Sequence, residues 1–126
     1  MIQDLGGWLL SQYGQEVLRP DPNLSRMRLA LGDLLPKLNQ KKIITVAGTN
    51  AKGETILRLS ALLGDRSHVV WTSPHIERVT ERFKSGSGEI DSTELSELVH
   101  FCDGDLRSRG IKLSYYEFLF YVFCQW

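Results

Sequence analysis

The chain has 126 residues, 42% of them hydrophobic, which suits one hydrophobic core and is short for two. Lysine plus arginine and aspartate plus glutamate number 15 each, and neither sign forms a long block, so the charge pattern excludes a nucleic-acid surface and favours small-molecule partners. No basic cluster precedes the first apolar stretch, and no apolar run approaches the roughly 20 residues of a membrane span. We therefore expect neither a secretory signal nor a membrane partner.

The cysteine content is two residues, Cys102 and Cys124. Both lie in apolar surroundings, and their spacing is not that of a metal site, so we interpret them as reduced core residues. Reduced cysteines and the missing signal sequence predict a cytoplasmic protein.

The first predicted element is a helix over 24–35, where leucines and a methionine recur at helical spacing. Asn23 is placed as its cap, and Pro36 is placed to stop it. Residues 43–47 then form a β-branched run that ends abruptly at Gly48, as a buried parallel strand does.

A helical period returns from Thr55, and Gly64 stands where a left-handed C-terminal cap belongs. Residues 68–71 are predicted to be the next strand. Residues 43–72 would then form a strand, loop, helix and strand unit, with its two strands parallel and joined by a right-handed crossover.

Residues 73–91 show little periodicity, and the serines and glycines of 85–88 predict a long loop with a small hairpin turn. Asp91 and Glu94 resemble a helix-start box, which opens a helix that ends near Gly110.

A last helix is predicted from Ser114, with Glu117 at capping-box spacing, to Trp126. Because two clear parallel strands are too few to cover these helices, the sheet looks unfinished. We predict an α/β fold with a partial, truncated three-layer parallel sheet flanked by helices. An exposed apolar sheet edge should favour self-association.

The most informative segment is 48–55, between the predicted strand and helix. Its glycines let backbone amides turn toward an anion, the helix start adds partial positive charge, and Lys52 adds a full charge. The common G-x-x-x-x-G-K-[ST] pattern fails here, because Val46, Ala51 and Gly53 occupy its glycine and hydroxyl positions. The predicted ATP-phosphate residues are Gly48, Thr49, Asn50, Ala51, Lys52, Gly53, Glu54 and Thr55.

This loop resembles the short loop of the Mur ligase superfamily, and specifically the G-T-N-G-K-G-S loop of folylpolyglutamate and dihydrofolate synthases, with Ala51 and Glu54 as departures. Residues 72–75 match the T-S-P-H of the same synthases, and residues 81–83 resemble their E-R-[IF] segment.

Two further segments extend the resemblance. Residues 115–118 resemble the family's [ST]-x-F-E segment, and residues 24–27 fit its L-x-R-[IM] helix. The resemblance therefore covers roughly residues 20–126, and its motifs occur in the family's order. It implies a P-loop-type sheet like that of the Mur ligase central domain. Residues 1–126 would be the amino-terminal part of the ATP-binding domain, with the carboxyl-terminal domain absent.

The resemblance also implies an activity. Such synthases phosphorylate a carboxylate with ATP and let the amine of an amino acid displace phosphate. The implied function is therefore an ATP-dependent, amide-forming ligase of folate metabolism, which adds L-glutamate to a folate or dihydropteroate through an acyl phosphate. Its cofactors would be ATP and Mg, with Ser73 as a Mg ligand and Thr55 as a second candidate. The implied pterin residues are Ser114, Tyr115, Tyr116 and Glu117, with His75 and Arg82 as further substrate contacts.

The two departures bear on this function. If the family's glycine takes a positive φ, Ala51 costs about 1 kcal/mol there. Glu54 replaces a hydroxyl that helps hold Mg and phosphate, and its carboxylate would repel a triphosphate. We expect the chain alone to be inactive. Two alternatives stay open, a non-catalytic remnant or interaction module of the same fold and a Mur ligase of peptidoglycan synthesis.

Overall fold

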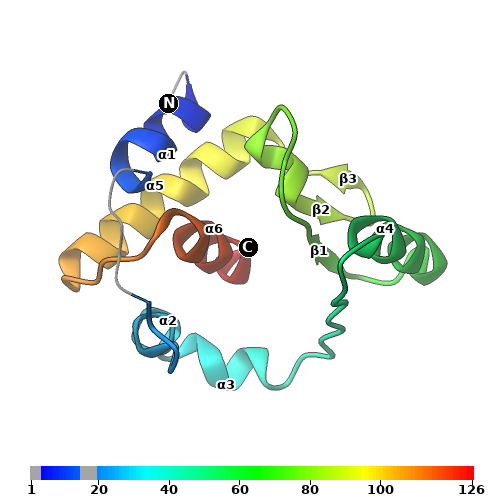
Figure 1. Ribbon diagram of the computed structural model, residues 1–126, viewed down its shortest axis with the longest axis horizontal. Helices are drawn as coiled ribbons and strands as arrows, with labels where there is room; N and C mark the ends of the chain where they lie inside the picture. Colours follow the sequence, from blue (N-terminus) through cyan, green and yellow to red (C-terminus); the bar gives the residue numbers. More distant parts are fainter. Residues whose placement is uncertain (1–3, 15–19) are drawn as a thin grey trace. The chain divides into compact units, whose positions relative to one another are not determined.

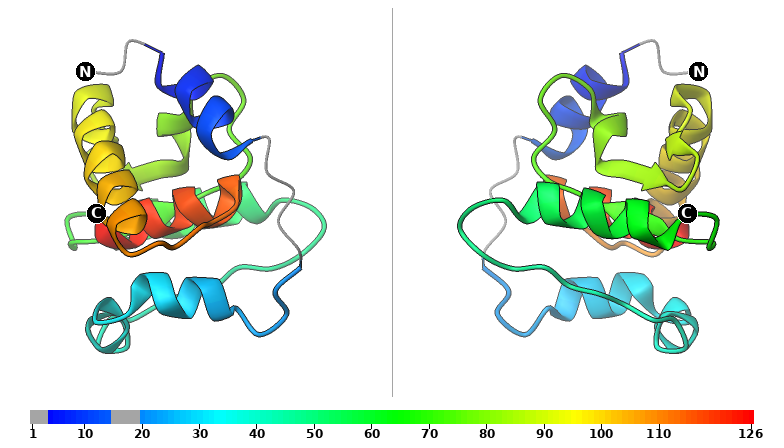
Figure 2. Two further views of the ribbon diagram at one scale, coloured as in Figure 1. Left: turned by 90° about the vertical axis from the view of Figure 1, so that its left-hand side faces the viewer. Right: turned by 90° about the vertical axis from the view of Figure 1, so that its right-hand side faces the viewer.

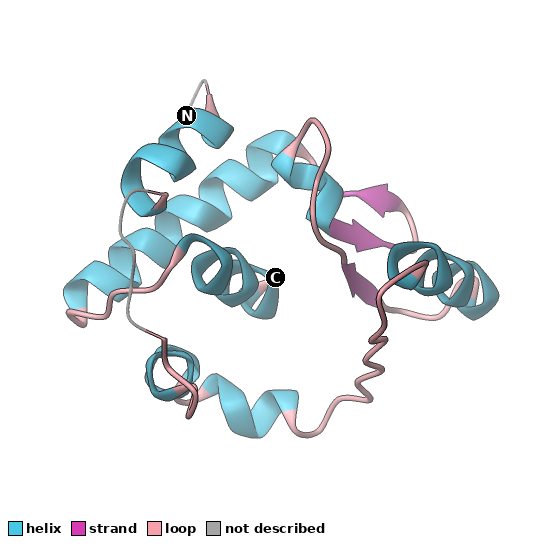
Figure 3. Cartoon of the chain, in the orientation of Figure 1, coloured by secondary structure: helices cyan, strands magenta, loops and turns pink. Residues whose placement is uncertain are grey.

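The structure, a computed structural model, describes residues 4–14 and 20–126. The chain divides into two units (Figure 1). The helical unit is Met1–Lys42 with Ser96–Trp126, and the sheet unit is Ile43–Leu95. The α/β class predicted from the sequence is confirmed by helices and strands within these units (Figure 3).

The helical unit is built around α6 (Tyr115–Gln125). This helix packs against α1 (Leu5–Tyr13) and α2 (Ser25–Leu31) (Figure 2). The ring of Tyr13 stacks on that of Phe118, with centroids 4.0 Å apart. The unit's core residues are Leu9, Met27, Ala30, Val99, Cys102, Leu106, Leu113, Phe118, Leu119, Tyr121 and Val122.

Capping sets the ends of the last two helices as the sequence predicts. Helix α5 (Ser92–Ser108) follows Asp91, whose carboxylate accepts from the amides of Thr93 and Glu94 at 2.8 and 3.3 Å. At the start of α6, Ser114 Oγ accepts from the Glu117 amide, and Glu117 Oε2 accepts from the Ser114 amide. Both predicted helix starts are therefore confirmed.

The single helix predicted over 24–35 is wrong, because the chain forms two short helices there. Helix α2 is followed by α3 (Leu34–Leu38), and Gly32 between them has a φ of 38°, which ends α2. Leu24, with a φ of 54°, stands at the cap position in place of Asn23. Pro36 lies in the first turn of α3, where its missing N–H removes no intrahelical bond.

The sheet unit contains three short strands, and all of them pair antiparallel. Strand β1 (Val69–Trp71) pairs with β2 (Phe83–Ser85), and β2 continues through a tight turn into β3 (Gly88–Glu89). The 3-10 helix η1 (Val79–Arg82) precedes β2. The predicted strand at 68–71 and the hairpin after it are confirmed.

The predicted parallel pairing of 43–47 with β1 does not form in this structure. Residues 43–47 carry no strand, and Ile43 and Ile44 are 70% and 67% exposed. A parallel strand is stable when both of its faces are buried, and the exposure of these side chains shows that burial is missing here. Strand β1 pairs instead with β2, which needs no buried crossover.

Helix α4 (Lys52–Leu63) ends at Gly64, as predicted, and Gly64 has a positive φ of 55°. Its ψ of −127° lies outside the left-handed helical region, so the predicted left-handed cap conformation is not the one that forms. The helix has no buried residue. A 2.7 Å contact between Ser60 Oγ and His68 Nε2 joins it to the residue before β1.

Cys102 and Cys124 are free thiols, as predicted. Burial raises the pKa of Cys102 to about 12 and that of Cys124 to about 11. None of the helices in the described ranges is long and apolar enough to cross a membrane.

Candidate phosphate-binding loop and neighbouring segments

The amino end of α4 presents backbone amides without a side-chain cap. Ala51 is the N-cap residue, and its side chain makes no capping hydrogen bond. The first helical bond runs from the Thr55 amide to the Ala51 carbonyl at 2.9 Å, so the amides of Lys52, Gly53 and Glu54 have no acceptor within the helix. All these residues are exposed. Free amides at the positive end of a helix are suited to an anion.

Lys52 brings its charge back over the same loop. Its Nζ donates to the carbonyl oxygen of Gly48, the first residue of the predicted phosphate loop. Gly48 has a φ of 151°, which favours glycine, and Thr49 and Asn50 between the two are exposed. The lysine side chain therefore folds back onto the loop that precedes α4.

Ala51 adopts the left-handed conformation, with φ 59° and ψ 13°. We expected a strain energy at Ala51 if the family's glycine takes a positive φ at this position, and Ala51 itself has a positive φ here. A Cβ in this region costs about 1 kcal/mol relative to glycine. The loop therefore keeps the turn that a glycine would make, at the expense of local strain.

Glu54 pairs with Arg58 one turn further along α4. Its Oε1 accepts from Arg58 Nη2 at 2.6 Å and from Nε at 3.1 Å. Both side chains are exposed, so the pair adds little stability. The cation of Arg58 lies beside the Glu54 carboxylate, which is the group expected to repel phosphate, so the pair reduces that repulsion.

The segment 72–75 leaves the sheet directly after β1. The Thr72 amide donates to the Arg82 carbonyl at 3.2 Å, and Thr72 Oγ1 donates to the Glu81 carbonyl at 3.0 Å. Ser73 is exposed, and its peptide bond to Pro74 is cis. Within residues 4–14 and 20–126, no cluster of three or more histidines, cysteines or acids is arranged to hold a metal ion. The role of Ser73 as a Mg ligand stays a prediction.

Glu81 has a structural role that was not predicted from the sequence. Its carboxylate accepts from the amides of Ile76, Glu77 and Arg78 at 2.8, 3.0 and 2.8 Å. These amides lower the pKa of Glu81 from 4.5 to about 2. Glu81 therefore holds the loop after Ser73 in shape. Its position three residues after Arg78, a capping spacing, was the available signal.

The two further substrate residues predicted from the sequence are in direct contact. Arg82 Nε donates to His75 Nδ1 at 2.8 Å. The guanidinium carbon also lies 5.6 Å from the centroid of the Trp71 ring, within cation–π range. Burial, and then the charge of Arg82, lower the pKa of His75. The sheet unit therefore holds a neutral histidine against a buried cation.

The predicted pterin residues lie in the helical unit, at the start of α6. Glu117 accepts from Arg26 on α2, and Tyr116 next to it is 52% exposed. Ser114 and Tyr115 are half-buried. Burial raises the pKa of Glu117, but Arg26 and Ser114 outweigh this effect and hold it below its ordinary value. Hydrogen bonds therefore hold Glu117 in place, and about half of the Tyr116 side chain is exposed.

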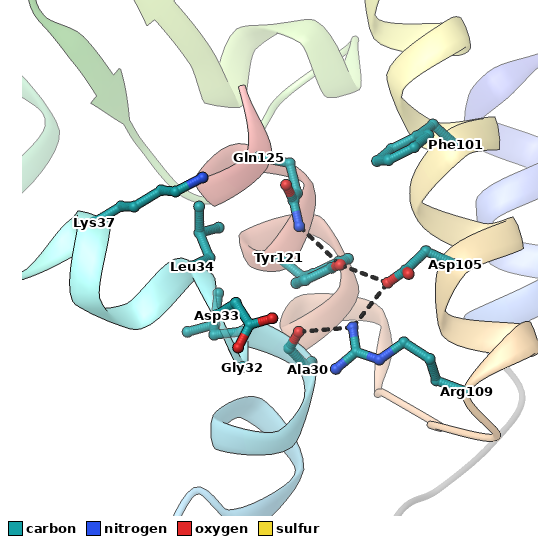
Figure 4. A pocket seen from close by; sticks show the side chains of 11 residues that line it. Ala30, Gly32, Asp33, Leu34, Lys37, Phe101, Asp105, Arg109, Tyr121 and Gln125 are labelled. Atoms are coloured by element: carbon teal, nitrogen blue, oxygen red, sulfur yellow. Dashed lines mark hydrogen bonds and ion pairs between the residues drawn. The ribbon is translucent and has the colours of Figure 1, made fainter.

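A cavity of about 440 Å³ in the helical unit was not predicted (Figure 4). Asp105 Oδ2 accepts from Arg109 Nη1 at 2.8 Å and from Tyr121 Oη at 2.9 Å. Arg109 also donates to the Ala30 carbonyl at 3.0 Å, and Gln125 donates to Tyr121 Oη at 2.8 Å. These groups satisfy one another and tie the end of α2 to α5 and α6. Their arrangement is structural.

Comparison with known proteins places this geometry in a family, although no family model matches the chain. The dihydrofolate synthase/folylpolyglutamate synthase of Escherichia coli (strain K12) is 30% identical over 119 residues, which cover 90% of this chain and 27% of that protein. The crystal structure of bifunctional folylpolyglutamate synthase/dihydrofolate synthase from Yersinia pestis CO92 is similar with a TM-score of 0.77 and 32% identity, and covers 94% of this chain and 29% of that chain.

A second crystal structure of such a bifunctional synthase, with Mn, AMPPNP and L-glutamate bound, is similar with a TM-score of 0.72 and 32% identity over 92% of this chain and 28% of that chain. The chain spans about a quarter of the length of the curated relatives it matches. Because similarity in both sequence and structure extends over nearly all of its own residues, the chain belongs to the folylpolyglutamate synthase/dihydrofolate synthase family.

Proposed function

We propose that this chain forms the ATP-binding part of a ligase that joins L-glutamate to the carboxylate of a folate or of dihydropteroate through an acyl phosphate. The observation that carries the proposal is the uncapped amino end of α4 beside Lys52. The relative with Mn, AMPPNP and L-glutamate bound supports a nucleotide, a divalent cation and glutamate as the ligands of the complete enzyme.

In this proposal the loop of residues 48–55 binds the phosphates of ATP. The exposed amides at the start of α4 donate to phosphate oxygens, and Lys52 exchanges its contact with the Gly48 carbonyl for a contact with phosphate. A carboxylate is a poor electrophile, and phosphorylation by ATP makes it reactive toward an amine. The contribution of these residues is to position the phosphates and to neutralise their charge.

We propose Mg as the cation, held with few protein ligands. Hydroxyl and phosphate oxygens are the ligands that Mg prefers, and it usually keeps several waters. Ser73 and Thr55 are exposed and carry hydroxyls in the sheet unit. These residues fit a cation that is bound mainly through the nucleotide.

We assign the pterin border to residues 114–117. Tyr116, which is 52% exposed, supplies the aromatic ring for contact with a flat heterocycle, and the capping box of Ser114 and Glu117 fixes the backbone from which that ring extends. Arg26 keeps Glu117 charged and in place.

The remaining part of a full-length relative would complete the sheet and the active site. The chain spans about a quarter of its curated relatives, and the apolar side chains of Ile43 and Ile44 are exposed. In this proposal residues 1–126 are the amino-terminal part of the ATP-binding domain. Residues 43–47 become a parallel strand when further strands and the carboxyl-terminal domain are present. Alone, the exposed apolar residues favour self-association.

Glutamate incorporation into a reduced folate tests this proposal. We expect no product from the 126-residue chain alone, and product when the remaining segment of a full-length relative is supplied in trans. The Lys52→Ala variant should abolish the product formed in trans. Turnover by the chain alone would contradict the claim that residues 1–126 need the remaining segment for activity. Turnover in trans that is retained in Lys52→Ala would contradict the claim that the loop of residues 48–55 binds the phosphates.

A second candidate is a non-catalytic module that keeps the fold. It is favoured by the strained φ of 59° at Ala51 and by the carboxylate of Glu54 in the first turn of α4. A module of this kind would bind no nucleotide. Titration of the purified chain with Mg and AMPPNP separates the two candidates.

A further inference from the structure

The guanidinium of Arg82 is buried without an anionic partner. The residue is 7% exposed, and its Nη1 is a buried side-chain atom with no hydrogen-bond partner within residues 4–14 and 20–126. Of its five N–H donors, the Nε–H is used by His75 Nδ1. None of the ion pairs between described residues includes Arg82. Burying an unpaired charge is costly, so an acceptor is expected at this position.

The carboxylates of Glu81 and Glu89, on the elements next to Arg82 in sequence, already accept hydrogen bonds from other groups. Glu81 accepts from three backbone amides of residues 76–78. Glu89 accepts from Arg78 Nη2 at 3.3 Å and from Thr80 Oγ1 at 3.1 Å. The ring of Trp71 attracts the positive charge, but a ring face does not replace acceptors in the plane of the N–H groups. Nη1, on the Nη1–Nη2 edge of the Arg82 guanidinium, therefore needs an acceptor from outside these side chains.

We propose that this edge of Arg82 binds an oxyanion, a phosphate or a carboxylate, of a small-molecule ligand. Two parallel N–H groups match the two oxygens of such an anion, which is the arrangement in which arginine binds most strongly. His75 contributes a second donor. Its Nδ1 accepts from Arg82, so its Nε2 carries the ring proton of the neutral imidazole.

Entry of the anion requires the segment 73–78 to shift, because Nη1 is buried. This segment lies outside the sheet, Pro74 and Ile76 are exposed, and Glu81 holds it through hydrogen bonds to backbone amides alone. The site shares no residue with the loop of residues 48–55. The proposal rests on the proposed function only for the source of the oxyanion, which is a phosphate group or the carboxylate of an amino acid.

The Nε–H resonance of Arg82, observed by ¹H–¹⁵N NMR, tests the proposal in the unmodified chain. Inorganic phosphate and L-glutamate are titrated separately, with sodium chloride added to equal ionic strength as the control. We expect a saturable shift with at least one of them, and the responding arm identifies the source. No saturable shift in either arm, with the resonance observed, would overturn the proposal.

Two variants separate this site from the phosphate loop. Arg82→Lys keeps the charge and loses the paired N–H groups, so oxyanion affinity, followed through neighbouring amides, should fall about tenfold or more. Lys52→Ala should leave the response of Arg82 unchanged even though it removes nucleotide binding. Equal oxyanion affinity in Arg82→Lys would contradict the site. Loss of the response in Lys52→Ala would show that the oxyanion binds at the loop and would overturn the proposal as well.

Discussion

Arg26 on α2 donates two hydrogen bonds to the carboxylate of Glu117 on α6, from Nη2 at 3.0 Å and from Nε at 3.3 Å. The same carboxylate accepts from the Ser114 amide at 2.8 Å and so completes the capping box of α6. One acidic side chain therefore fixes both the start of a helix and its contact with another helix, 91 residues away in sequence.

Removing the cation should destabilise this junction. We expect Arg26→Met to lower the free energy of unfolding by about 1 to 2 kcal/mol, because it removes two charge-assisted hydrogen bonds from a partly buried carboxylate. Arg28→Met, on the exposed side of the same helix, is the matched control and should change stability by less than about 0.5 kcal/mol. Urea unfolding measures both. Equal losses in the two variants would contradict this role of Arg26.

Glycine at position 51 should stabilise the phosphate loop. Because Ala51 has a φ of 59°, we expect Ala51→Gly to raise the free energy of unfolding of α4 by about 1 kcal/mol. Ala61→Gly, inside the same helix, should lower it by about 1 kcal/mol. Hydrogen exchange of the α4 amides reports both changes. A loss of stability in Ala51→Gly would show that the left-handed turn is not strained.

The charge of Glu54 should oppose nucleotide binding, and Arg58 should reduce that effect. We expect Glu54→Ser to tighten binding of Mg and AMPPNP by about 1 kcal/mol, and Arg58→Met to weaken it, because the carboxylate then lacks its cation. The double variant should bind like Glu54→Ser. Calorimetric titration gives the three affinities. Weaker binding by Glu54→Ser would identify Glu54 as a ligand of the cation instead.

Stability should depend on the ionisation of Glu81 at acid pH. Its pKa is lowered from 4.5 to about 2 in the folded chain, so its contribution is fully present above pH 4.5 and is lost as pH falls toward 2. Glu81→Gln should therefore be less stable than the parent chain at pH 7, and the difference should shrink between pH 4.5 and 2. Thermal unfolding across this range measures it. A difference that does not change with pH would contradict the assignment.

Local signals in the sequence predicted the parts of the fold that local interactions decide. The box of Ser114 and Glu117 and the end of α4 at Gly64 depend on residues within one turn, and the structure confirms both. The strand expected over 43–47 depends on neighbours that the pattern does not contain, and it is absent here. Helix α1 was not predicted because two of its first three residues are glycines, although the cap at Asp4 was an available signal.

The candidate site was likewise predictable where it depends on contiguous residues. The loop of residues 48–55 was predicted because its residues are contiguous, and the structure adds the return of Lys52 to Gly48 and the turn at Ala51. The contact of Arg82 with His75 and the use of Glu81 by three amides follow from how the chain bends after β1. The hydrophobic periodicity of the sequence contains no signal for such a bend.

The central claim is that the amino end of α4 binds the phosphates of ATP. Thermal stabilisation of the chain by Mg and AMPPNP, compared between the parent, Lys52→Ala and the exposed-lysine control Lys41→Ala, tests it most directly. We predict stabilisation of the parent and of the control, and none of Lys52→Ala, because Lys52 supplies the full positive charge beside the exposed amides. Equal stabilisation of all three would contradict the claim.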